Sequence, residues 1–528
     1  MLTLRPYQKE PVRKAIDYFR EENPDPSLMV LPTGAGKSVI AAEVAAACPD
    51  PILVVQPTKE LLEQNLEKYR ILCGELAPAG VYSTSFGKHQ IDHVTFATIG
   101  SIKTIGTQFR QLGFRKMLID EAHLYPRKEQ SMLGAFLRDS GIRQVLGMTA
   151  TPLKLENFSV KHGEKYDKWS ELIMLTNLSP SGTFFKRIIH VTQIQELTAL
   201  GYWSPLRYEL LPFSRDHLEM NSAGSEYSDE SVITAYEYNN IRANILAALD
   251  YHRERRHILV FVPSVEEAEA LASFYPESAA VSGNTPKKER KNIIDAFRAG
   301  GLRVIFNCNV LATGFDYPEI DMLITGFSTA SMAKYYQVLG RGVRIHPDKK
   351  DCVVVEAGGN YQRFGKVEDL QYEWDGKWRM FGSGDCLISG IPVQCIGSVG
   401  KADLAAAYAG TYAWETIDFG KHKGKPYSEV PPPYLAWMLQ NPSPYRNLLE
   451  NMHMRAYAVR AMENHIRDTR NDPPLTDFPD GKYAGENMGF APKNYLTYYY
   501  NSKEWNETND SLRRGIEILL NKHGYPKS

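Results

Sequence analysis

The chain has 528 residues, 43% of them hydrophobic, so it is long enough for roughly three or four domains that each bury a core. Lysine and arginine total 61 against 62 acidic residues, which excludes a strongly basic protein that coats nucleic acid through its net charge. No run approaches the ~20 apolar residues of a membrane span, and the start lacks the apolar core of a signal peptide. We therefore expect a soluble intracellular protein without a membrane partner.

Short apolar segments that alternate with helical patterns occupy the first part of the chain. Residues 60–72 have such a helical pattern, and short apolar strands between helices are typical of a parallel α/β sheet. The apolar segments lie at 29–31, 52–57, 93–98, 116–123 and 144–152. We expect one α/β lobe here.

A second series of apolar segments begins about a hundred residues later. An amphipathic helix is predicted at 287–299 between two of its strands. The segments lie at 257–264, 278–283, 302–308, 321–327 and 351–357. The fold class that follows is α/β, with two tandem parallel-sheet lobes and an irregular α+β region at the C-terminus.

The segments outside the two series have a different composition. Residues 153–250 are richer in aromatic and charged residues, and 217–231 are typical of a solvated loop or flexible insertion. After about residue 365 the alternation stops and Trp, Tyr, Gly and Pro become frequent. The predicted domains are lobe one at 1–186, a connector with an insertion at 187–250, lobe two at 251–364 and an accessory region at 365–528.

The cysteines predict no disulfide framework. Six of them are scattered without a CxxC pair in a chain too large to need disulfide staples, so reduced thiols are the simpler interpretation. Cys386 and Cys395 are the alternative, as two ligands of an incomplete zinc site, although a structural zinc needs four ligands at short spacing.

The segment LPTGAGKS at 31–38 follows a predicted strand and precedes a helical run, which is the context of a phosphate-binding loop. Its glycines allow the backbone N–H groups to face phosphate, Lys37 neutralises the β and γ phosphates, and Ser38 offers a hydroxyl to Mg²⁺. A plain glycine-rich turn is the alternative, since Leu31 stands where a first glycine usually falls. The predicted nucleotide-binding residues are Thr33, Gly34, Ala35, Gly36, Lys37 and Ser38.

The segment MLIDEAH at 117–123 brings two acidic residues to the end of a buried strand. Ligands of open α/β sheets bind at that edge. Asp120 is predicted to hold Mg²⁺ and Glu121 to orient or deprotonate the attacking water. Adjacent acids after a strand are often only a solvated turn, but a phosphate loop in the same lobe makes the pair specific.

Residues Asp120 to His123 resemble the DEAH box of superfamily 2 helicases, and other motifs of that family follow in the same order between residues 4 and 346. LRPYQ at 4–8 resembles the motif that reads adenine, which implies that Arg5 and Gln8 contact the base. The resemblance implies two RecA-like lobes that bind ATP and Mg²⁺ and hydrolyse ATP at their interface.

Two further motifs of the first lobe carry the resemblance. QPTKELLEQ at 56–64 resembles the first strand-contacting motif, and TATP at 149–152 resembles the motif that couples hydrolysis to lobe movement. The coupling residues implied are His123, Thr149 and Thr151.

In the second lobe, ATGFD at 312–316 resembles the fifth family motif and QVLGRGVR at 337–344 the sixth. The resemblance places Gly314 and Asp316 near the nucleotide and Gln337 near the γ-phosphate. It implies that Arg341 and Arg344 supply positive charge to the transition state, where charge spreads over the phosphoryl oxygens. Without the other motifs, two arginines three residues apart on a helix would more often form salt bridges at the surface.

The resemblance also implies a nucleic-acid groove across both lobes, in which hydroxyls and backbone amides hold phosphates without reading sequence. Each such position is otherwise an ordinary turn or cap residue. The residues implied are Pro57, Thr58, Thr98, Ser264 and Thr313.

A C-terminal segment at 412–445 resembles the small module at the end of exonuclease X-type proteins. Its lysines alternate with glycine and are followed by aromatic residues, which suits phosphate contact with base stacking. The alternative is a minor aromatic core beside a solvated loop. The basic residues implied are Lys421, Lys423 and Lys425.

Three functions follow as hypotheses. The motif set resembles the branch that contains DNA translocases, branch-migration enzymes and restriction motors, so an ATP-driven motor on single-stranded, forked or branched DNA is the first. An RNA-dependent ATPase is the second. The third is a nucleotide-switched clamp with little turnover, against which the intact Glu121 and the two arginines argue. A bacterial or phage-infected cytoplasm is the expected location.

Overall fold

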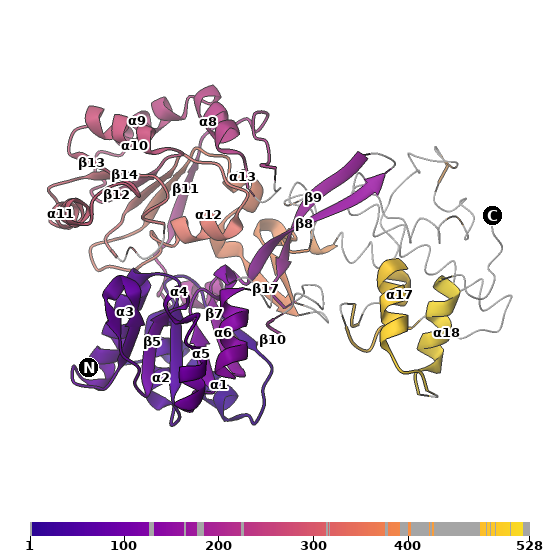
Figure 1. Ribbon diagram of the computed structural model, residues 1–528. Helices are drawn as coiled ribbons and strands as arrows, with labels where there is room; N and C mark the ends of the chain where they lie inside the picture. The colour runs from indigo at the N-terminus through magenta and orange to yellow at the C-terminus, as the bar shows by residue number, and fades with distance from the viewer. Residues whose placement is uncertain are drawn as a thin grey trace. The chain divides into compact units, whose positions relative to one another are not determined.

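The structure is a computed structural model (Figure 1). It describes residues 3–125, 131–162, 165–176, 184–222, 226–312, 315, 317–374, 378–390, a few positions between 396 and 434, and 476–520 with single-residue gaps. The chain forms two compact units. The first comprises 1–155, 174–176 and 181–372, and the second comprises 156–173, 177–180 and 373–528. No helix among the described residues combines the length and apolarity needed to cross a membrane.

The first unit begins with an eight-stranded sheet in the order β10-β1-β7-β6-β2-β5-β3-β4. All neighbouring strands are parallel except β3 and β4. Every residue of β1, β2 and β6 is buried, which is why these strands appear in the sequence as continuous apolar runs. In the order of the sheet, the strands are Arg187–Val191, Ser27–Val30, Gln144–Thr149, Lys116–Ile119, Ile52–Gln56, Val94–Thr98, Gly80–Ser83 and Lys88–His89.

Two groups of helices belong to this sheet. Helix α2 packs against α1 and α3, while α6 packs against α4 and α5. In chain order from α1 to α7, the helices of this part are Pro6–Arg20, Lys37–Ala47, Lys59–Cys73, Ile99–Ile102, Gly106–Gln111, Met132–Ser140 and Ile194–Ala199. Three short 3-10 turns complete it at Thr84–Phe86, Ala122–Leu124 and, further along the chain, Val367–Asp369.

A second sheet in the same unit has six strands, all parallel, in the order β11-β16-β15-β12-β14-β13. Its core joins the strands to helices α8, α9 and α10 through buried residues such as Ile245, Leu271 and Ile324. In sheet order the strands are Leu206–Leu210, Cys352–Glu356, Met322–Thr325, Ile258–Phe261, Val304–Asn307 and Ser278–Val281. Helices α8 to α13 are Asp229–Tyr238, Ile241–Tyr251, Val265–Phe274, Lys287–Arg298, Met332–Leu339 and Tyr361–Phe364.

The two sheets confirm the predicted α/β class with two parallel-sheet lobes (Figure 1). The segment expected to connect them supplies an edge strand to each, since β10 pairs with β1 and β11 pairs with β16. Each of these two strands lies at the edge of its sheet and pairs with a strand that is distant in the sequence. Local apolar periodicity does not predict such a pairing. The lobe boundaries at 186, 250 and 364 remain a proposal.

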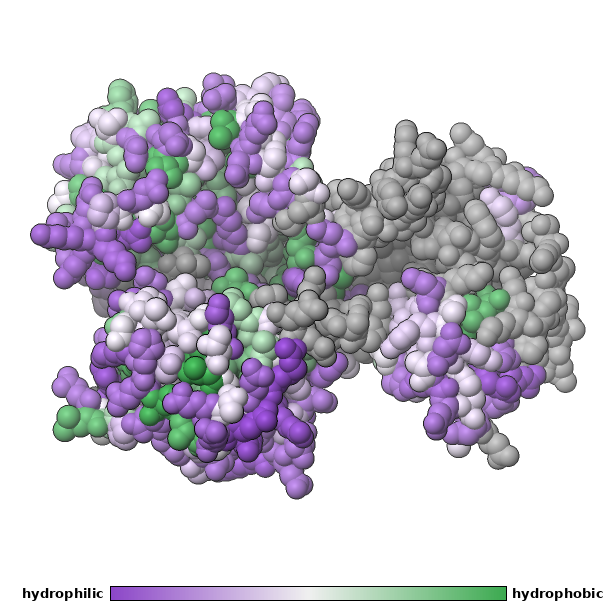
Figure 2. All heavy atoms as spheres, in the orientation of Figure 1, coloured by the Kyte–Doolittle hydropathy of each residue, from purple (hydrophilic) through white to green (hydrophobic). Residues whose placement is uncertain are grey.

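Two two-stranded sheets extend into the second unit, and two described helices lie within it. Strands β8 (Leu153–His162) and β9 (Lys165–Met174) form one two-stranded sheet, and β17 (Gln371–Trp374) and β18 (Trp378–Phe381) form another. Helices α17 (Lys493–Ser502) and α18 (Asp510–Leu519) pack together beside a cluster in which the ring centroids of Phe478 and Tyr499 lie 4.9 Å apart. The remaining described turns are Ser383–Asp385 and Met488–Phe490. On the described surface in Figure 2, hydrophobic residues are scattered among hydrophilic ones.

Candidate nucleotide site

The predicted nucleotide and coupling residues of the first lobe lie along one edge of its sheet. Strands β1, β7, β6, β2 and β5 are consecutive neighbours and all parallel, so their carboxyl ends meet at the same edge. The phosphate loop follows β1, Thr149 ends β7 and Asp120 follows β6. Pro57 follows β2 and Thr98 ends β5. Three adjacent strands thus carry the predicted hydrolytic groups, and the next two carry predicted strand contacts.

The phosphate loop, residues 31–36, turns tightly into α2. Gly34 and Gly36 have φ angles of 82° and 79°, in the left-handed region that favours glycine. A Cβ on Gly36 would lie 2.4 Å from Gln8 Nε2, so this position has no space for a side chain. Lys37 and Ser38 occupy the first turn of α2, where backbone N–H groups have no acceptor within the helix. The local geometry is that of an anion-binding helix start.

Two carboxylates face this lysine. Asp120 is 2% exposed, and burial followed by the neighbouring Glu121 raises its pKa to about 6. Asn65 Nδ2 donates to Asp120 Oδ2 at 3.2 Å. Glu121 Oε1 lies 3.7 Å from Lys37 Nζ, and Glu121 has a φ of 48°, a strained value for a residue with a side chain.

This donor set fits a magnesium nucleotide. Among the described residues, Glu121 Oε2 is buried without a hydrogen-bond partner. A hard dication takes oxygen ligands, and a positive charge beside Asp120 favours its ionised form, as Lys37 already does. Ser38 and Asp120 are therefore suited to hold Mg²⁺, which supplies charge to the phosphate oxygens when bound.

The DEAH segment is joined to the TATP segment through a hydrogen bond of His123. His123 Nδ1 lies 2.9 Å from Thr149 Oγ1, and the N–H of Thr151 donates to that same hydroxyl at 3.1 Å. Burial lowers the pKa of His123 to about 4, so the imidazole is neutral at pH 7. The predicted coupling residues are thus brought together, while their coupling role remains a prediction.

The predicted base-reading residues contact the phosphate loop. Gln8 is 4% exposed and its Nε2 donates to the carbonyl of Ala35 at 2.8 Å. The hydroxyl of Tyr7 donates to the same carbonyl at 3.0 Å. Arg5 stacks over the ring of Tyr202, with 4.6 Å to its centroid, and the rings of Tyr7 and Tyr202 lie 5.0 Å apart. A planar cation and two aromatic rings thus lie beside the loop, which suits stacking on a base.

Residues from beyond the first sheet hold both backbone polar groups of Thr33. The hydroxyl of Tyr336, on α12, accepts the Thr33 N–H at 3.2 Å, and Trp203 Nε1 donates to the Thr33 carbonyl at 2.9 Å. A Cβ on Gly340 would lie 2.4 Å from Thr33 Cγ2. The phosphate loop of lobe one is therefore in direct contact with the QVLGRGVR segment of lobe two.

The two predicted arginines lie in this segment. Arg341 is 6% exposed, and its Nη1 donates to the Phe315 carbonyl at 2.6 Å. Arg344 Nη1 donates to the same carbonyl at 3.0 Å. Gln337 lies on α12, one residue after Tyr336, and its carbonyl accepts from Arg341 Nε. Gly314 and Asp316 lie outside the described residues.

The predicted nucleic-acid contacts serve partly as helix caps. Thr58 and Ser264 cap α3 and α10 by accepting the N–H of Leu61 and Glu267, and Thr98 Oγ1 lies 2.9 Å from Ser101 Oγ. Thr313, Lys421 and Lys423 lie outside the described residues, and Lys425 is exposed. Cys386 is half-buried, and Cys395 lies outside the described residues, so the zinc alternative stays a hypothesis.

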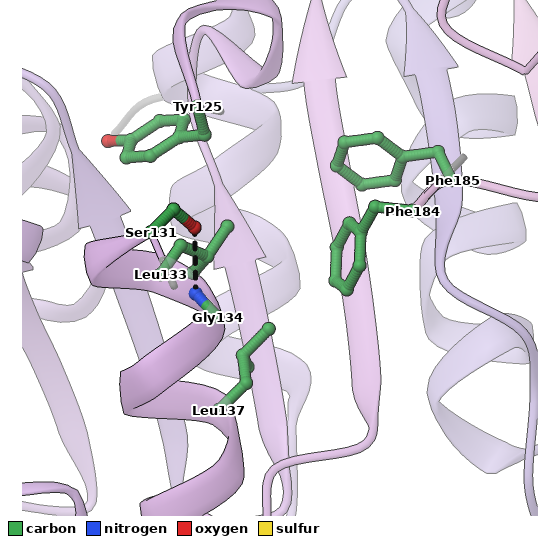
Figure 3. Close-up of a pocket in the computed structure, with 7 residues that line it drawn as sticks. All are labelled: Tyr125, Ser131, Leu133, Gly134, Leu137, Phe184 and Phe185. Atoms are coloured by element: carbon green, nitrogen blue, oxygen red, sulfur yellow. Dashed lines mark hydrogen bonds between the residues drawn. The ribbon is translucent and has the colours of Figure 1, made fainter. Parts of the chain in front are cut away.

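A small pocket of lobe one is separate from the phosphate loop (Figure 3). It is partly open to solvent and its lining is mostly apolar, and the Ser131 hydroxyl accepts the Gly134 N–H at 3.1 Å as the cap of α6. Its lining residues are Tyr125, Ser131, Leu133, Gly134, Leu137, Phe184 and Phe185. None of these described lining residues is cationic, so they do not suit phosphate.

The sequence missed four residues of this site: Asn65, Tyr202, Trp203 and Tyr336. Asn65 is an ordinary member of a helical pattern and contacts Asp120 55 positions away. Trp203 and Tyr336 reach Thr33 from 170 and 303 positions away. The aromatic residues directly before Gln337 were a signal for Tyr336 alone, and they are equally typical of a core.

We expect Tyr336→Phe to lower kcat for ATP about tenfold. The change leaves the buried Thr33 N–H without its acceptor, which costs about 1–3 kcal/mol, and about 1.4 kcal/mol of barrier is a factor of ten. Tyr335→Phe is the matched control, since Tyr335 is equally buried and its hydroxyl donates to the Gly365 carbonyl instead. Steady-state ATPase assays measure both; an equal effect of the two variants contradicts the role of the Thr33 contact.

Comparisons with known proteins agree with this arrangement. The family model "Type III restriction enzyme, res subunit" matches residues 1–154, and "Helicase conserved C-terminal domain" matches 241–346. The chain is 26% identical over 377 residues to the DNA 3'-5' translocase XPB2 of Sulfurisphaera tokodaii, covering 67% of this chain and 81% of that one.

Two more similarities extend the comparison. The chain is 24% identical to a protein named irc3 of Schizosaccharomyces pombe, described as a mitochondrial ATP-dependent helicase, covering 67% of this chain and 57% of the yeast protein. The fold is similar to a fragment described as an HsdR subunit of a type I restriction enzyme from Vibrio vulnificus. That match has a TM-score of 0.50 and 18% identity, and it covers 69% of this chain and 66% of the other.

Proposed function

We propose that this chain, a superfamily 2 helicase related to restriction motors, is an ATP-dependent DNA translocase or helicase. One observation carries the proposal. The phosphate loop of lobe one and the arginine segment of lobe two meet at Thr33, where Tyr336 binds the backbone and Gly340 packs on the side chain. ATP bound at the loop would thus be sensed by both lobes, and its hydrolysis would change how they meet.

We propose the following roles for the site residues, which their positions support. Lys37 and the N–H groups at the start of α2 bind phosphate, and Ser38 with Asp120 holds Mg²⁺. Glu121, 3.7 Å from Lys37, orients or deprotonates the attacking water. Arg341 and Arg344 stabilise the charge that develops on the transferred phosphoryl group.

The polymer is proposed to lie along the same sheet edges. Pro57 and Thr58 follow strand β2 and Thr98 ends strand β5, beside the strands that carry the hydrolytic groups. Ser264 stands at the start of α10 in lobe two. Hydroxyls and backbone amides at strand ends contact phosphates without reading bases. DNA is the proposed polymer because the names of the archaeal and Vibrio relatives concern DNA translocation and restriction.

The test is the steady-state ATPase rate with no polymer, single-stranded DNA, duplex DNA, forked DNA and single-stranded RNA. We expect strong stimulation by DNA, greatest with forks. Stimulation by RNA alone would make the protein an RNA-dependent ATPase. No stimulation by any polymer, together with ATP-dependent DNA retention, would favour a clamp.

A further inference from the structure

Lys349 is hydrogen-bonded to the backbone of the QVLGRGVR segment, residues 337–344, which contains Arg341 and Arg344. Its ammonium donates to the carbonyls of Gly342 at 2.6 Å, Arg344 at 2.7 Å and Pro318 at 3.3 Å. An ammonium has three N–H donors and no acceptor, so three carbonyls use its whole capacity. Two of these carbonyls belong to the QVLGRGVR segment, and one of them is that of Arg344 itself.

The partner on the other side of this contact is the stretch of chain that contains Phe315 and Pro318. Pro318 accepts from Lys349, while the Phe315 carbonyl accepts from both Arg341 and Arg344. The lysine therefore fixes the backbone of Arg344 to the same stretch that its guanidinium contacts.

The QVLGRGVR segment also packs closely on the second sheet, which restricts its backbone on that side. A Cβ on Gly342 would lie 2.6 Å from Cys352 Sγ on β16, so the backbone is already in close contact with the sheet. Arg344 comes after α12 has ended at Leu339, and no helix continues to hold it. The lysine contacts act on this irregular stretch.

We propose that Lys349 is a positioning residue for Arg344, which holds the backbone from which the arginine reaches the γ-phosphate. This inference rests on the proposed role of Arg344 in hydrolysis. Lys349 does not touch the nucleotide; it acts through the carbonyls of Gly342 and Arg344.

The charge of Lys349 makes the proposal testable by pH. Burial lowers the pKa of Lys349 to about 8, and Arg344 acts in the same direction, whereas Cys352, Asp321 and Asp351 oppose it. The two aspartates have other partners, since Asp321 accepts the N–H groups of Arg256 and His257, and Asp351 pairs with Arg255. A neutral amine has one donor fewer, so one carbonyl loses its bond when the pH rises.

We expect wild-type kcat to fall as the pH rises through about 8, with little change in KM for ATP. Lys349→Met keeps most of the aliphatic stem and removes the charge. It should lower kcat at pH 7 by about 10- to 100-fold, because a misplacement of about 1 Å can cost 10²-fold, and it should abolish the fall above pH 8. Lys350→Met, the same change at the exposed neighbour, should behave as wild type.

The decisive comparison is a cycle with Arg344→Ala. If Lys349 acts through Arg344, adding Lys349→Met to Arg344→Ala lowers kcat little further. If the two residues act independently, their fold-losses in kcat multiply in the double variant. An unchanged kcat in Lys349→Met beside a low kcat in Arg344→Ala overturns this inference alone. An unchanged kcat in Arg344→Ala overturns the finger assignment as well. A wild-type kcat that stays flat as the pH rises well past 8 overturns the inference without any variant.

Discussion

Replacing Lys37 with alanine should reduce ATP turnover to background, by about 10²- to 10³-fold or more, the cost of removing one electrostatic contact to the reacting group. Lys37 lies beside the acidic pair, with Nζ 3.7 Å from Glu121 Oε1. Its positive charge opposes the rise in the pKa of Asp120, so the variant also makes that carboxylate harder to ionise. The variant therefore removes the positive charge that binds the phosphates, and it also lowers the affinity of the Asp120 site for Mg²⁺.

The measurement is phosphate release at saturating DNA, beside DNA binding by fluorescence anisotropy without nucleotide. DNA binding should be retained, since the predicted strand contacts lie beyond β2 and β5. Lys14→Ala is the matched control, because Lys14 is a lysine of α1 that pairs with Glu10 one helical turn away. Turnover in Lys37→Ala at the level of this control would remove the phosphate-loop assignment.

The sequence was sufficient for the strands that carry the site. Segments such as 52–56 and 258–261 are buried on both sides in a parallel sheet, so they appear as short continuous apolar runs bounded by polar ends. Because carboxyl ends of parallel strands share an edge, the order of the segments alone predicts that the phosphate loop and Asp120 lie together. The contact of His123 with Thr149 follows from the same geometry, with β6 and β7 adjacent.

The contacts between lobes could not be predicted in this way. Tyr336 binds Thr33 across 303 positions, and which rotamer of an aromatic residue reaches a backbone amide depends on how two sheets pack. The edge strands β10 and β11 were not predicted from the sequence, for a related reason. Their residues are mostly half-buried or exposed, as the pattern of Leu206–Leu210 shows, so they lack the apolar run that marks a central strand.

Lys349 illustrates a third limit. In the sequence it is one of two adjacent lysines in a polar turn, and a solvated charge is the ordinary interpretation of such a pair. Only the folded backbone gives its ammonium three carbonyls, two from residues 342–344 and one from Pro318, while Lys350 stays exposed. Backbone carbonyls have no residue-specific signal in a sequence.

Arg344→Ala should lower kcat by about 10³-fold, the lower end of what an arginine finger contributes, with a much smaller change in KM for ATP. Its Nη1 and that of Arg341 donate to the same Phe315 carbonyl, but Arg341 is 6% exposed and Arg344 is half-buried. Of the two, the less buried Arg344 is the one that we propose to reach a phosphate. Arg341→Ala, by contrast, removes a buried guanidinium and should also lower the thermal stability.

Charge that appears only in the transition state explains the expected split between kcat and KM, because an interaction absent from the ground state does not tighten substrate binding. Arg344→Lys should recover little, since a point charge does not replace a planar fork of donors. Arg253→Ala, at a side chain that is 81% exposed, controls for loss of a surface charge. A raised KM with unchanged kcat in Arg344→Ala would mean that this arginine binds ATP in its ground state, and the transition-state role would then pass to Arg341.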